Sequence, residues 1–253
     1  MSLNRYETDK WLAPYLLFHY GTEKEQLGFA FGPKSSLNFP VRCVTECLDS
    51  TRLSSDAKAL DIGCAVGRSS FELARFCKEV MAIDYSHTFI NAAKHLQEKG
   101  QLEYSCFGEG GKSVQVLAKT PEDIDLKRVE FRQGDAMDLF LKSSQFDVVL
   151  AANLLCRLSN PLFFLEQIHT LVAPGGQLIL TSPYSWSEEF TPKNAWLGAE
   201  ENHQKTPLES IKEILVANFH FVRAFDMPFL IREHRRFYQW GIAEASIWHR
   251  TNQ

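Results

Sequence analysis

Short apolar runs alternate with segments of helical periodicity through the middle of this 253-residue chain. The apolar runs predict strands, because short runs of consecutive apolar residues bounded by turn residues are typical of buried strands. These strands are expected at 58–62, 79–84, 129–132, 146–152 and 177–182. Helical periodicity predicts the helices between them at 67–77, 86–99 and 161–172. This alternation indicates a parallel sheet with helices on both faces.

The N-terminal segment adds helices before the first strand. We predict a helix at 6–21 that Gly21 stops, a loop at 28–39 and a second helix at 39–53. The first helix is too aromatic for a solvated tail, so it must pack on the rest of the chain. It is either part of the core or a lid over a ligand pocket, with His19 and Tyr20 reaching the substrate.

The C-terminal third predicts a long loop, one helix and two closing strands. The predicted ranges are 183–206 for the loop, 207–217 for the helix, and 219–225 and 242–250 for the strands, with a polar, aromatic linker at 232–240. Since no helix separates the closing strands, one of them must run antiparallel to the rest.

Together these elements predict an α/β fold with a seven-stranded, mostly parallel sheet, one antiparallel strand, helices on both faces and an N-terminal helical extension. We expect a single domain over 1–253. Its expected parts are an extension or lid (4–55), a cofactor-binding core (56–182) with a hairpin insertion (101–128), and a substrate-side loop with closing strands (183–253).

Composition narrows the classes of function. Apolar residues make up 45% and charged residues 23% of the chain, which are ordinary globular values. A net charge of −4 shows no excess of basic residues of the kind that binds nucleic acid. No apolar run is long enough to span a membrane. The six cysteines form no C-x-x-C pair, so we interpret them as buried small residues of a cytoplasmic protein, although Cys43 and Cys47 share a helix face. We expect no metal site.

The turn after the first strand carries the strongest functional signal, with the sequence D-I-G-C-A-V-G-R at 61–68. A strand, a glycine turn and a helix N-terminus together form a cradle for a nucleotide-like ligand. Asp84 ends the second strand, where an acidic side chain suits ribose hydroxyls. The turn lacks the third glycine of a dinucleotide fingerprint and the lysine of a P-loop.

The pattern resembles the class I S-adenosylmethionine-dependent methyltransferases, whose first motif is an acidic residue followed by G-x-G-x-G. The resemblance implies a Rossmann-like fold with S-adenosylmethionine as cofactor and S-adenosylhomocysteine as product. It places Asp61 near the cofactor's amino group and Asp84, with Tyr85 after it, at the ribose. The backbone of the glycine loop passes under the methionine and ribose portions, at Gly63, Cys64, Ala65 and Gly67, with Ala65 standing where the family has its middle glycine.

Two further motifs match the family in order. By the resemblance, the Asp135 side chain and the Ala136 amide contact adenine. An alternative for Asp135 is a helix N-cap. The segment around Asn153 and Leu154 corresponds to the mouth of the methyl-transfer site, which makes Asn153 a catalytic candidate.

The flanking segments resemble the C-terminal methyltransferase domain of ovothiol-biosynthesis enzymes. That family methylates an imidazole nitrogen of 4-mercaptohistidine, also called 5-thiohistidine. The resemblance rests on the aromatic segment at 6–21, the loop at 28–40, the hairpin insertion and the aromatic C-terminal tail. It implies a small-molecule substrate and a sulfur-inserting, iron-dependent partner enzyme, whose own region is absent from this chain.

Several polar residues in these flanks are candidates for binding or deprotonating such an acceptor. His19 and His234 are candidate general bases, since histidine titrates near neutral pH. Arg235 and Arg236 are candidates for gripping a carboxylate. Candidates for an ammonium group are Glu233, Tyr20 and Tyr184. Solvated or structural roles remain open for all of these side chains.

Two other functions remain open at this stage. The acceptor is alternatively another small amine, thiol or carboxylate, because a fold does not name a substrate. The chain is alternatively a non-catalytic module that binds the cofactor beside a partner enzyme. The end of the fourth strand lacks the Asn/Asp-Pro-Pro-aromatic sequence used on flipped bases, which argues against nucleic-acid methylation.

Overall fold

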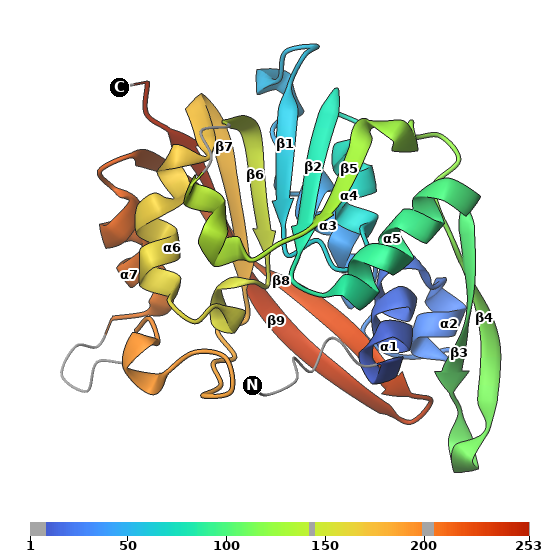
Figure 1. Ribbon diagram of the computed structural model, residues 1–253. Helices are drawn as coiled ribbons and strands as arrows, with labels where there is room; N and C mark the ends of the chain where they lie inside the picture. Colours follow the sequence, from blue (N-terminus) through green and yellow to red (C-terminus); the bar gives the residue numbers. More distant parts are fainter. Residues whose placement is uncertain (1–8, 142–144, 199–204, 253) are drawn as a thin grey trace.

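The computed structural model describes residues 9–141, 145–198 and 205–252. Among these residues, seven strands form one sheet in the order β5-β2-β1-β6-β7-β9-β8 (Figure 1). The strands are β1 (Lys58–Ile62), β2 (Glu79–Asp84), β5 (Val129–Gln133), β6 (Phe146–Ala152), β7 (Val172–Ser182), β8 (Phe219–His234) and β9 (Phe237–Arg250). Within this described sheet β9 runs antiparallel to the other six strands, which confirms the predicted topology.

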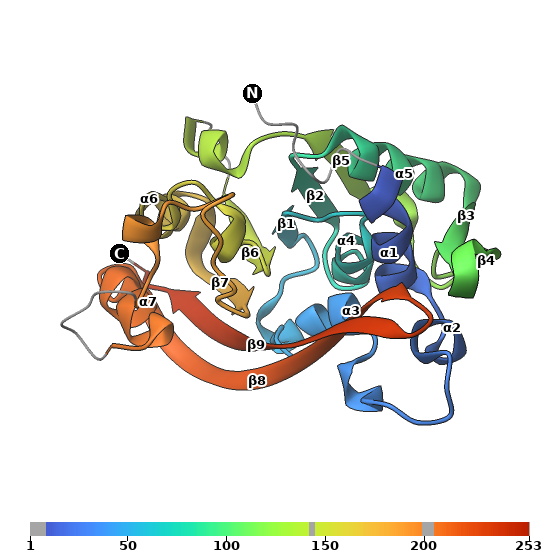
Figure 2. The ribbon, with the colours of Figure 1, turned by 90° about the horizontal axis from the view of Figure 1, so that it is seen from below.

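Helices cover both faces of the sheet, as predicted. They are α1 (Asp9–Tyr20), α2 (Glu23–Leu27), α3 (Phe39–Thr45), α4 (Arg68–Leu73), α5 (His87–Lys99), α6 (Pro161–Gln167) and α7 (Pro207–Leu215). Successive strand residues point to opposite faces. Val148 and Leu150 accordingly join the core under α1, α3, α4 and α5, while Val149 and Ala151 join the core under α6 and α7. Figures 1 and 2 show these two helical layers.

The predicted hairpin insertion is confirmed. β3 (Gln101–Phe107) and β4 (Ser113–Lys119) pair antiparallel in a sheet of their own. This hairpin packs beside α1 and α5, away from the strands that carry the glycine turn.

Several predicted helices are shorter in the structure. The helix predicted at 39–53 ends at Thr45, and a 3-10 turn follows at Ser50–Arg52. The helix predicted at 67–77 ends at Leu73, and the one predicted at 161–172 ends at Gln167 before another 3-10 turn. Part of the predicted helix at 6–21 lies outside the described residues.

The predicted linker at 232–240 is wrong. β8 and β9 are 16 and 14 residues long and pair almost to their ends, with a turn at Arg235 and Arg236. Figure 2 shows that this hairpin extends from the sheet to the region of α1 and α2. The outer part of this hairpin extends beyond the other strands of the sheet. Its side chains are therefore partly exposed on both faces, and its sequence has the polar character of a loop.

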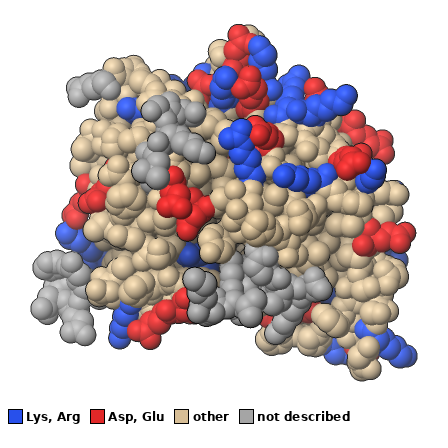
Figure 3. All heavy atoms as spheres, viewed as in Figure 1, with Lys and Arg blue, Asp and Glu red and all other residues tan. Residues whose placement is uncertain are grey.

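Burial of the cysteines agrees with the sequence prediction. All six lie in the described residues, where they are free thiols and buried. None of the helices in the described ranges has the length and apolar character required to cross a bilayer. On the face shown in Figure 3, basic and acidic side chains are interspersed rather than gathered by sign.

Candidate active site

A cavity with a volume of about 570 Å³ opens at the carboxyl ends of the parallel strands. Residues that follow β1, β2, β5 and β6 line it, among them Gly63, Asp84, Asp135 and Asn153. The sheet order reverses direction between β1 and β6. Open α/β sheets bind ligands at such a switch point. The structure therefore brings the predicted cofactor residues of four separate strands into one cavity.

Backbone hydrogen bonds hold the glycine loop at the end of β1. The Gly63 and Cys64 amides donate to Ile83 O at 2.8 and 3.1 Å, and the Gly67 amide donates to Cys64 O at 2.9 Å. Gly63, Ala65 and Gly67 all have positive φ, at 77°, 48° and 87°. Gly63 and Ala65 line the cavity, whereas Cys64 and Gly67 do not and act by shaping the loop.

Asp84 is oriented by two backbone amides. Ala65 N donates to its Oδ2 at 2.9 Å and Ser86 N donates to its Oδ1 at 2.8 Å. These contacts hold the carboxylate at the cavity wall beside the glycine loop. Tyr85 lines the cavity next to it and is 54% exposed, so its ring is available to a ligand.

Asp61 lies beneath the glycine loop and is completely buried. Its Oδ2 accepts hydrogen bonds from Ser69 Oγ at 2.7 Å and Ser70 Oγ at 2.6 Å. Its Oδ1 has no hydrogen-bond partner among the described residues. Burial raises the pKa of this carboxyl to about 6, against the opposing effect of the two serine hydroxyls. Asp61 does not line the cavity, so in this structure its carboxyl holds the first turn of α4 against the end of β1.

Asp135 serves a structural role and lines the cavity at the same time. Its Oδ1 accepts from Met137 N at 2.9 Å, which caps the 3-10 helix Ala136–Leu141. Asp135 and Ala136 both lie on the cavity wall after β5. The N-cap interpretation and the ligand-binding interpretation are therefore compatible.

Asn153 is locked at the end of β6 by Thr181. Its amide donates to Thr181 O at 2.8 Å, and Thr181 Oγ1 donates to Asn153 Oδ1 at 3.0 Å. Its φ is 52°, a left-handed conformation that asparagine tolerates better than most residues. Both Asn153 and Leu154 line the cavity, and Leu154 packs where a Cβ on Gly63 would lie.

Helix α1 is both a core element and a cavity wall. Leu16, Leu17 and Phe18 are buried in the core. Trp11, Tyr15 and His19 line the cavity, one helical turn apart. This helix therefore belongs to the core and also borders the cavity.

His19 lies in the cavity wall, but it is a poor general base. Burial, and to a lesser degree the nearby Arg68 charge, lower the pKa of its imidazole to about 3. Its Nδ1 is buried without a hydrogen-bond partner in the described structure. A base with so low a pKa has little affinity for a proton at neutral pH. This low pKa argues against the predicted role of His19 as a proton acceptor, while the residue does lie in the cavity wall.

Four predicted residues lie at or near the β8–β9 turn, outside the cavity. Arg236 and Arg235 place Nε at 2.8 and 3.6 Å from Glu109 Oε1 of the β3–β4 hairpin. His234 Nδ1 accepts from Arg236 N at 3.3 Å within the turn. Glu233 accepts from Gln239 Nε2 at 2.5 Å. This placement contradicts the predicted carboxylate clamp and the predicted base at His234.

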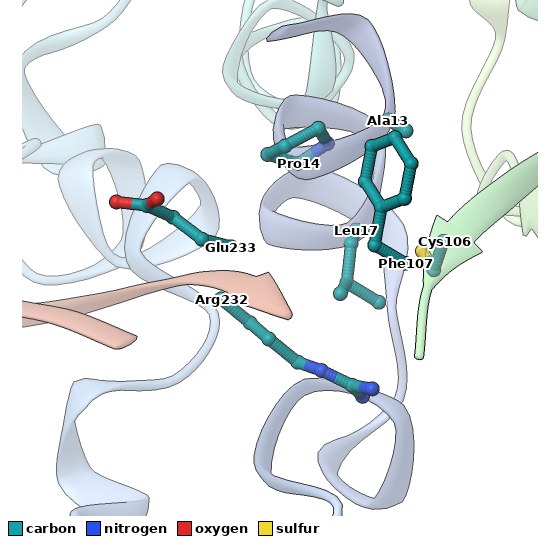
Figure 4. Close-up of a pocket in the computed structure, with 7 residues that line it drawn as sticks. All are labelled: Ala13, Pro14, Leu17, Cys106, Phe107, Arg232 and Glu233. Carbon is teal, nitrogen blue, oxygen red and sulfur yellow. The ribbon is translucent and has the colours of Figure 1, made fainter. Parts of the chain in front are cut away.

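Figure 4 shows where Glu233 points. Its side chain and that of Arg232 extend in opposite directions from β8, next to the α1 residues Ala13, Pro14 and Leu17. Arg232 donates to Glu25 O of α2. Glu233 reaches the main cavity only indirectly, through Gln239, which does line it.

Tyr20 and Tyr184, which were predicted to contact an ammonium group, form hydrogen bonds outside the cavity. Tyr20 Oη donates to Val66 O at 2.7 Å, which ties α1 to the glycine loop. Tyr184 Oη donates to Glu244 Oε2 at 2.9 Å. Neither tyrosine lines the cavity. Both support elements that border it.

The structure adds cavity residues that the sequence did not single out. Phe39 and Phe229 extend the aromatic wall begun by Tyr15 and Trp11. Arg157 and Glu189 add two opposite charges to the lining. Arg157 Nη1 donates to Ser185 O at 2.8 Å, and its guanidinium lies 5.1 Å from the Phe190 ring centroid. These residues come from segments with no motif, so only the fold brings them together.

Comparison with known proteins agrees with this geometry. Residues 60–180 match the family model described as Methyltransferase domain. Those residues run from β1 through β7 and contain the glycine loop, Asp84, Asp135 and Asn153. Residues 60–180 therefore correspond to an S-adenosylmethionine-dependent methyltransferase domain with the class I fold. The Asp61–Asp84–Asp135 series and the glycine loop are therefore its cofactor-binding candidates.

Two curated relatives share the methyltransferase region. A highly reducing polyketide synthase of Alternaria alternata is 32% identical over 126 residues, which are 46% of this chain and 5% of the synthase. A ubiquinone biosynthesis O-methyltransferase of Ruegeria pomeroyi is 27% identical over 135 residues, which are 53% of this chain and 44% of that enzyme. The chain spans less than half the length of either relative.

Solved structures share the fold of the methyltransferase domain. A Methanosarcina mazei S-adenosylmethionine-dependent methyltransferase has a TM-score of 0.53 at 18% identity, covering 80% of this chain and 96% of its own. The Bradyrhizobium japonicum N-methyltransferase NodS, with S-adenosylhomocysteine, has a TM-score of 0.50 at 15% identity and 83% coverage of each chain. The [4+2]-cyclase SpnF has a TM-score of 0.51 at 16% identity, covering 79% and 78%.

Proposed function

We propose that this protein transfers a methyl group from S-adenosylmethionine to a small molecule, most specifically to an imidazole nitrogen of 4-mercaptohistidine. The observation that carries the proposal is the composition of the main cavity. One end is built from the glycine loop, Asp84 and Asp135, and the other from the aromatic wall of α1, α3 and β8.

The residues at the cofactor end suit successive chemical groups of S-adenosylmethionine. Asp135 and Ala136 would receive adenine, and Asp84 would receive the ribose hydroxyls. Gly63 also lines this end, with the Leu154 side chain packed against the position that a Cβ would take. When bound, S-adenosylmethionine supplies an electrophilic methyl group on a sulfonium sulfur.

The acceptor end suits a small planar ring with charged substituents. Tyr15, Phe39 and Phe229 offer aromatic faces and edges for ring stacking. Arg157 and Glu189 carry the charges that a carboxylate and an ammonium group of an amino acid would meet. They replace the residues of the β8–β9 turn that the sequence suggested for these roles.

Catalysis in this cavity depends on position rather than on proton transfer. A neutral mercaptoimidazole already presents a nitrogen lone pair, so no residue must deprotonate it before attack. Asn153, fixed by Thr181, and the aromatic wall hold the acceptor in line with the methyl group. Such alignment supplies much of the acceleration in bimolecular transfer.

Another small amine, thiol or carboxylate is the main alternative acceptor. The R. pomeroyi relative is named as an O-methyltransferase and NodS as an N-methyltransferase, so relatives of this fold differ in the atom they methylate. A non-catalytic, cofactor-binding module is a second alternative. SpnF, named as a cyclase, indicates that the fold alone does not decide the reaction.

A labelled-donor assay with a panel of acceptors tests the proposal. The panel contains 4-mercaptohistidine, histidine, and unrelated amines, thiols and phenols, each with methyl-labelled S-adenosylmethionine. We expect turnover of 4-mercaptohistidine and little of histidine. Turnover of another acceptor alone would replace the specific substrate but keep the activity. Binding of S-adenosylhomocysteine without turnover of any acceptor would favour the module.

A further inference from the structure

The polar residue Gln239 lies on the part of the cavity wall that the β8–β9 hairpin forms. In the register of this hairpin, Ile231 pairs with Gln239 and Phe229 pairs with Gly241. Paired residues of antiparallel strands point to the same face of the sheet, and so do residues two apart along a strand. Phe229, Ile231 and Gln239 accordingly line the cavity together. Gln239 therefore adds an amide group to two apolar side chains of the same hairpin.

Packing places Gln239 beside the aromatic wall of the cavity. The Phe229 ring lies against the Phe39 ring, with centroids 5.3 Å apart. It also extends over Gly241, where it occupies the space that a Cβ would need. That Cβ would lie on the same face of β9 as the Gln239 side chain, two residues earlier. The Phe229 ring and the Gln239 amide are therefore neighbours on one surface.

Glu233 fixes the orientation of this amide. The strand pairing shifts register between Arg232 and His234, so Glu233 is an extra residue in β8. A bulge of this kind re-aims a side chain. Gln239 Nε2 donates to Glu233 Oε1 at 2.5 Å. Because an ionised carboxylate only accepts hydrogen bonds, Gln239 must turn its NH₂ group, and not its oxygen, toward Glu233.

The carbonyl oxygen of Gln239 remains for a ligand. In the part of the chain that the structure describes, Gln239 Oε1 accepts no hydrogen bond. Glu233 forms no ion pair with these residues, since Arg235 and Arg236 pair with Glu109 instead. The negative charge of Glu233 polarises the amide through their hydrogen bond, which makes Oε1 a stronger acceptor. This arrangement suits a ligand that offers an N–H donor.

We propose that Gln239 Oε1 accepts a hydrogen bond from the imidazole N–H of the methyl acceptor, and that Glu233 positions Gln239 for this contact. The inference rests on the proposed function, in which the ring of 4-mercaptohistidine stacks on the aromatic wall. A neutral imidazole has one N–H nitrogen and one nitrogen with a free lone pair. The hydrogen bond made by the first nitrogen decides which of the two carries the lone pair. Gln239 is then a specificity-determining residue that selects the nitrogen to be methylated.

The transfer step balances without a protein base. The nitrogen with the lone pair bonds to the methyl carbon while the carbon–sulfur bond breaks, and the sulfur keeps that electron pair. The ring becomes an N-methylimidazolium, and the proton on its other nitrogen, beside Gln239, then passes to water. Gln239 is an exposed residue, so water reaches this position.

Binding of the acceptor without turnover tests the contact. Titration calorimetry measures the affinity of the S-adenosylhomocysteine complex for 4-mercaptohistidine. We expect Gln239→Leu to weaken this affinity about threefold to tenfold, the scale of one uncharged hydrogen bond. Glu233→Ala should weaken it in the same direction, and the double variant should bind no more weakly than Gln239→Leu alone. Gln115→Leu makes the same change on the exposed face of the β3–β4 hairpin and should have no effect.

The position of the methyl group on the product gives a second readout. We expect the unsubstituted protein to methylate mainly one ring nitrogen, and Gln239→Leu to lower the ratio of the two N-methyl isomers about threefold to tenfold, as resolved by NMR. A purely structural role would lower the rate and leave this ratio unchanged. An unchanged affinity or an unchanged isomer ratio in Gln239→Leu would overturn the assignment. If the unsubstituted protein binds S-adenosylhomocysteine but neither binds nor methylates 4-mercaptohistidine, the proposed acceptor is wrong and the assignment falls with it.

Discussion

Backbone strain at single residues gathers around the cavity. Among the described non-glycine residues with positive φ, Ala65 and Asn153 line the cavity and Tyr184 lies between two residues that do. A left-handed backbone costs an L-residue about 1–2 kcal/mol, so it persists only where the surroundings impose it. At Ala65 the cause is visible, because this conformation directs its amide to Asp84 Oδ2.

Ala65→Gly should therefore stabilise the protein. Glycine adopts a φ of 48° without steric cost, and the gain outweighs the extra entropy of glycine in the unfolded chain. We expect the free energy of unfolding to rise by about 0.5–1 kcal/mol in urea denaturation. Ala65→Val serves as the opposite control and should destabilise. A loss of stability in Ala65→Gly would show that the loop is not strained at this position.

His19 and Asp61 give opposite pH dependences. The pKa of His19 is about 3 in the folded protein against 6.5 in an unfolded chain, so falling pH between these values favours the unfolded state. The pKa of Asp61 is about 6 against 3.8, so falling pH between these values favours the folded state. Each contributes at most about 1.4 kcal/mol per pH unit.

Variants at these two positions should separate the contributions. Between pH 6 and pH 4, His19→Asn should lose less unfolding free energy than the unsubstituted protein, and Asp61→Asn should lose more. Urea denaturation at the two pH values measures the change. Identical slopes for all three proteins would mean that neither side chain is as deeply desolvated in solution as the structure indicates.

At the scale of elements, the β8–β9 hairpin joins the sheet to the N-terminal helices. Its strands pair over most of their length, and its turn reaches Glu109 of the β3–β4 hairpin. Arg232 and Tyr238 bond to the carbonyls of Glu25 and Leu27 in α2. The hairpin therefore supports α1 and α2, while its own residues Phe229 and Ile231 face the cavity.

Loss of the arginines at the turn should affect stability slightly and substrate binding not at all. In Arg235→Ala/Arg236→Ala we expect the free energy of unfolding to fall by less than about 1 kcal/mol, because exposed ion pairs contribute little. The KM for the methyl acceptor should stay unchanged, since both side chains lie outside the cavity. Steady-state kinetics with the double variant gives the answer. A large increase in KM would indicate that these two arginines do bind the methyl acceptor.

At the scale of the whole molecule, the cavity couples ligand binding to folding. Its walls come from the glycine loop, four strand ends, α1 and β8, so only the folded chain assembles it. A ligand that binds the folded state alone shifts the unfolding equilibrium by mass action. The cofactor should therefore bridge the N-terminal helix and the sheet.

S-adenosylhomocysteine should raise the unfolding free energy by about 2.7 kcal/mol at 100 times its Kd. Asp84→Asn keeps the size of the side chain but removes the charge that suits ribose hydroxyls, so it should reduce this stabilisation at the same ligand concentration. Thermal denaturation with and without ligand measures both effects. Equal stabilisation of the two proteins would argue against a ribose contact at Asp84.

Local patterns carried most of the information about the methyl-donor site. The glycine loop, Asp84 and Asp135 lie at strand ends, and parallel strands bring their carboxyl ends to one edge of a sheet. Periodicity predicted where these strands end, and the resemblance to class I methyltransferases assigned the residues after them to one cofactor site. The same reasoning failed for Arg235 and His234, because their position depends on where a long hairpin leaves the sheet.

The sequence by itself determined the alternating strands and helices of the core, the presence of an antiparallel strand and the burial of the cysteines. These follow from hydrophobic period and turn chemistry, which act over neighbouring residues. Only the tertiary structure decided the acceptor end, where Phe39, Arg157 and Phe229 converge from distant segments. It also decided the state of His19, since desolvation depends on everything packed around the ring.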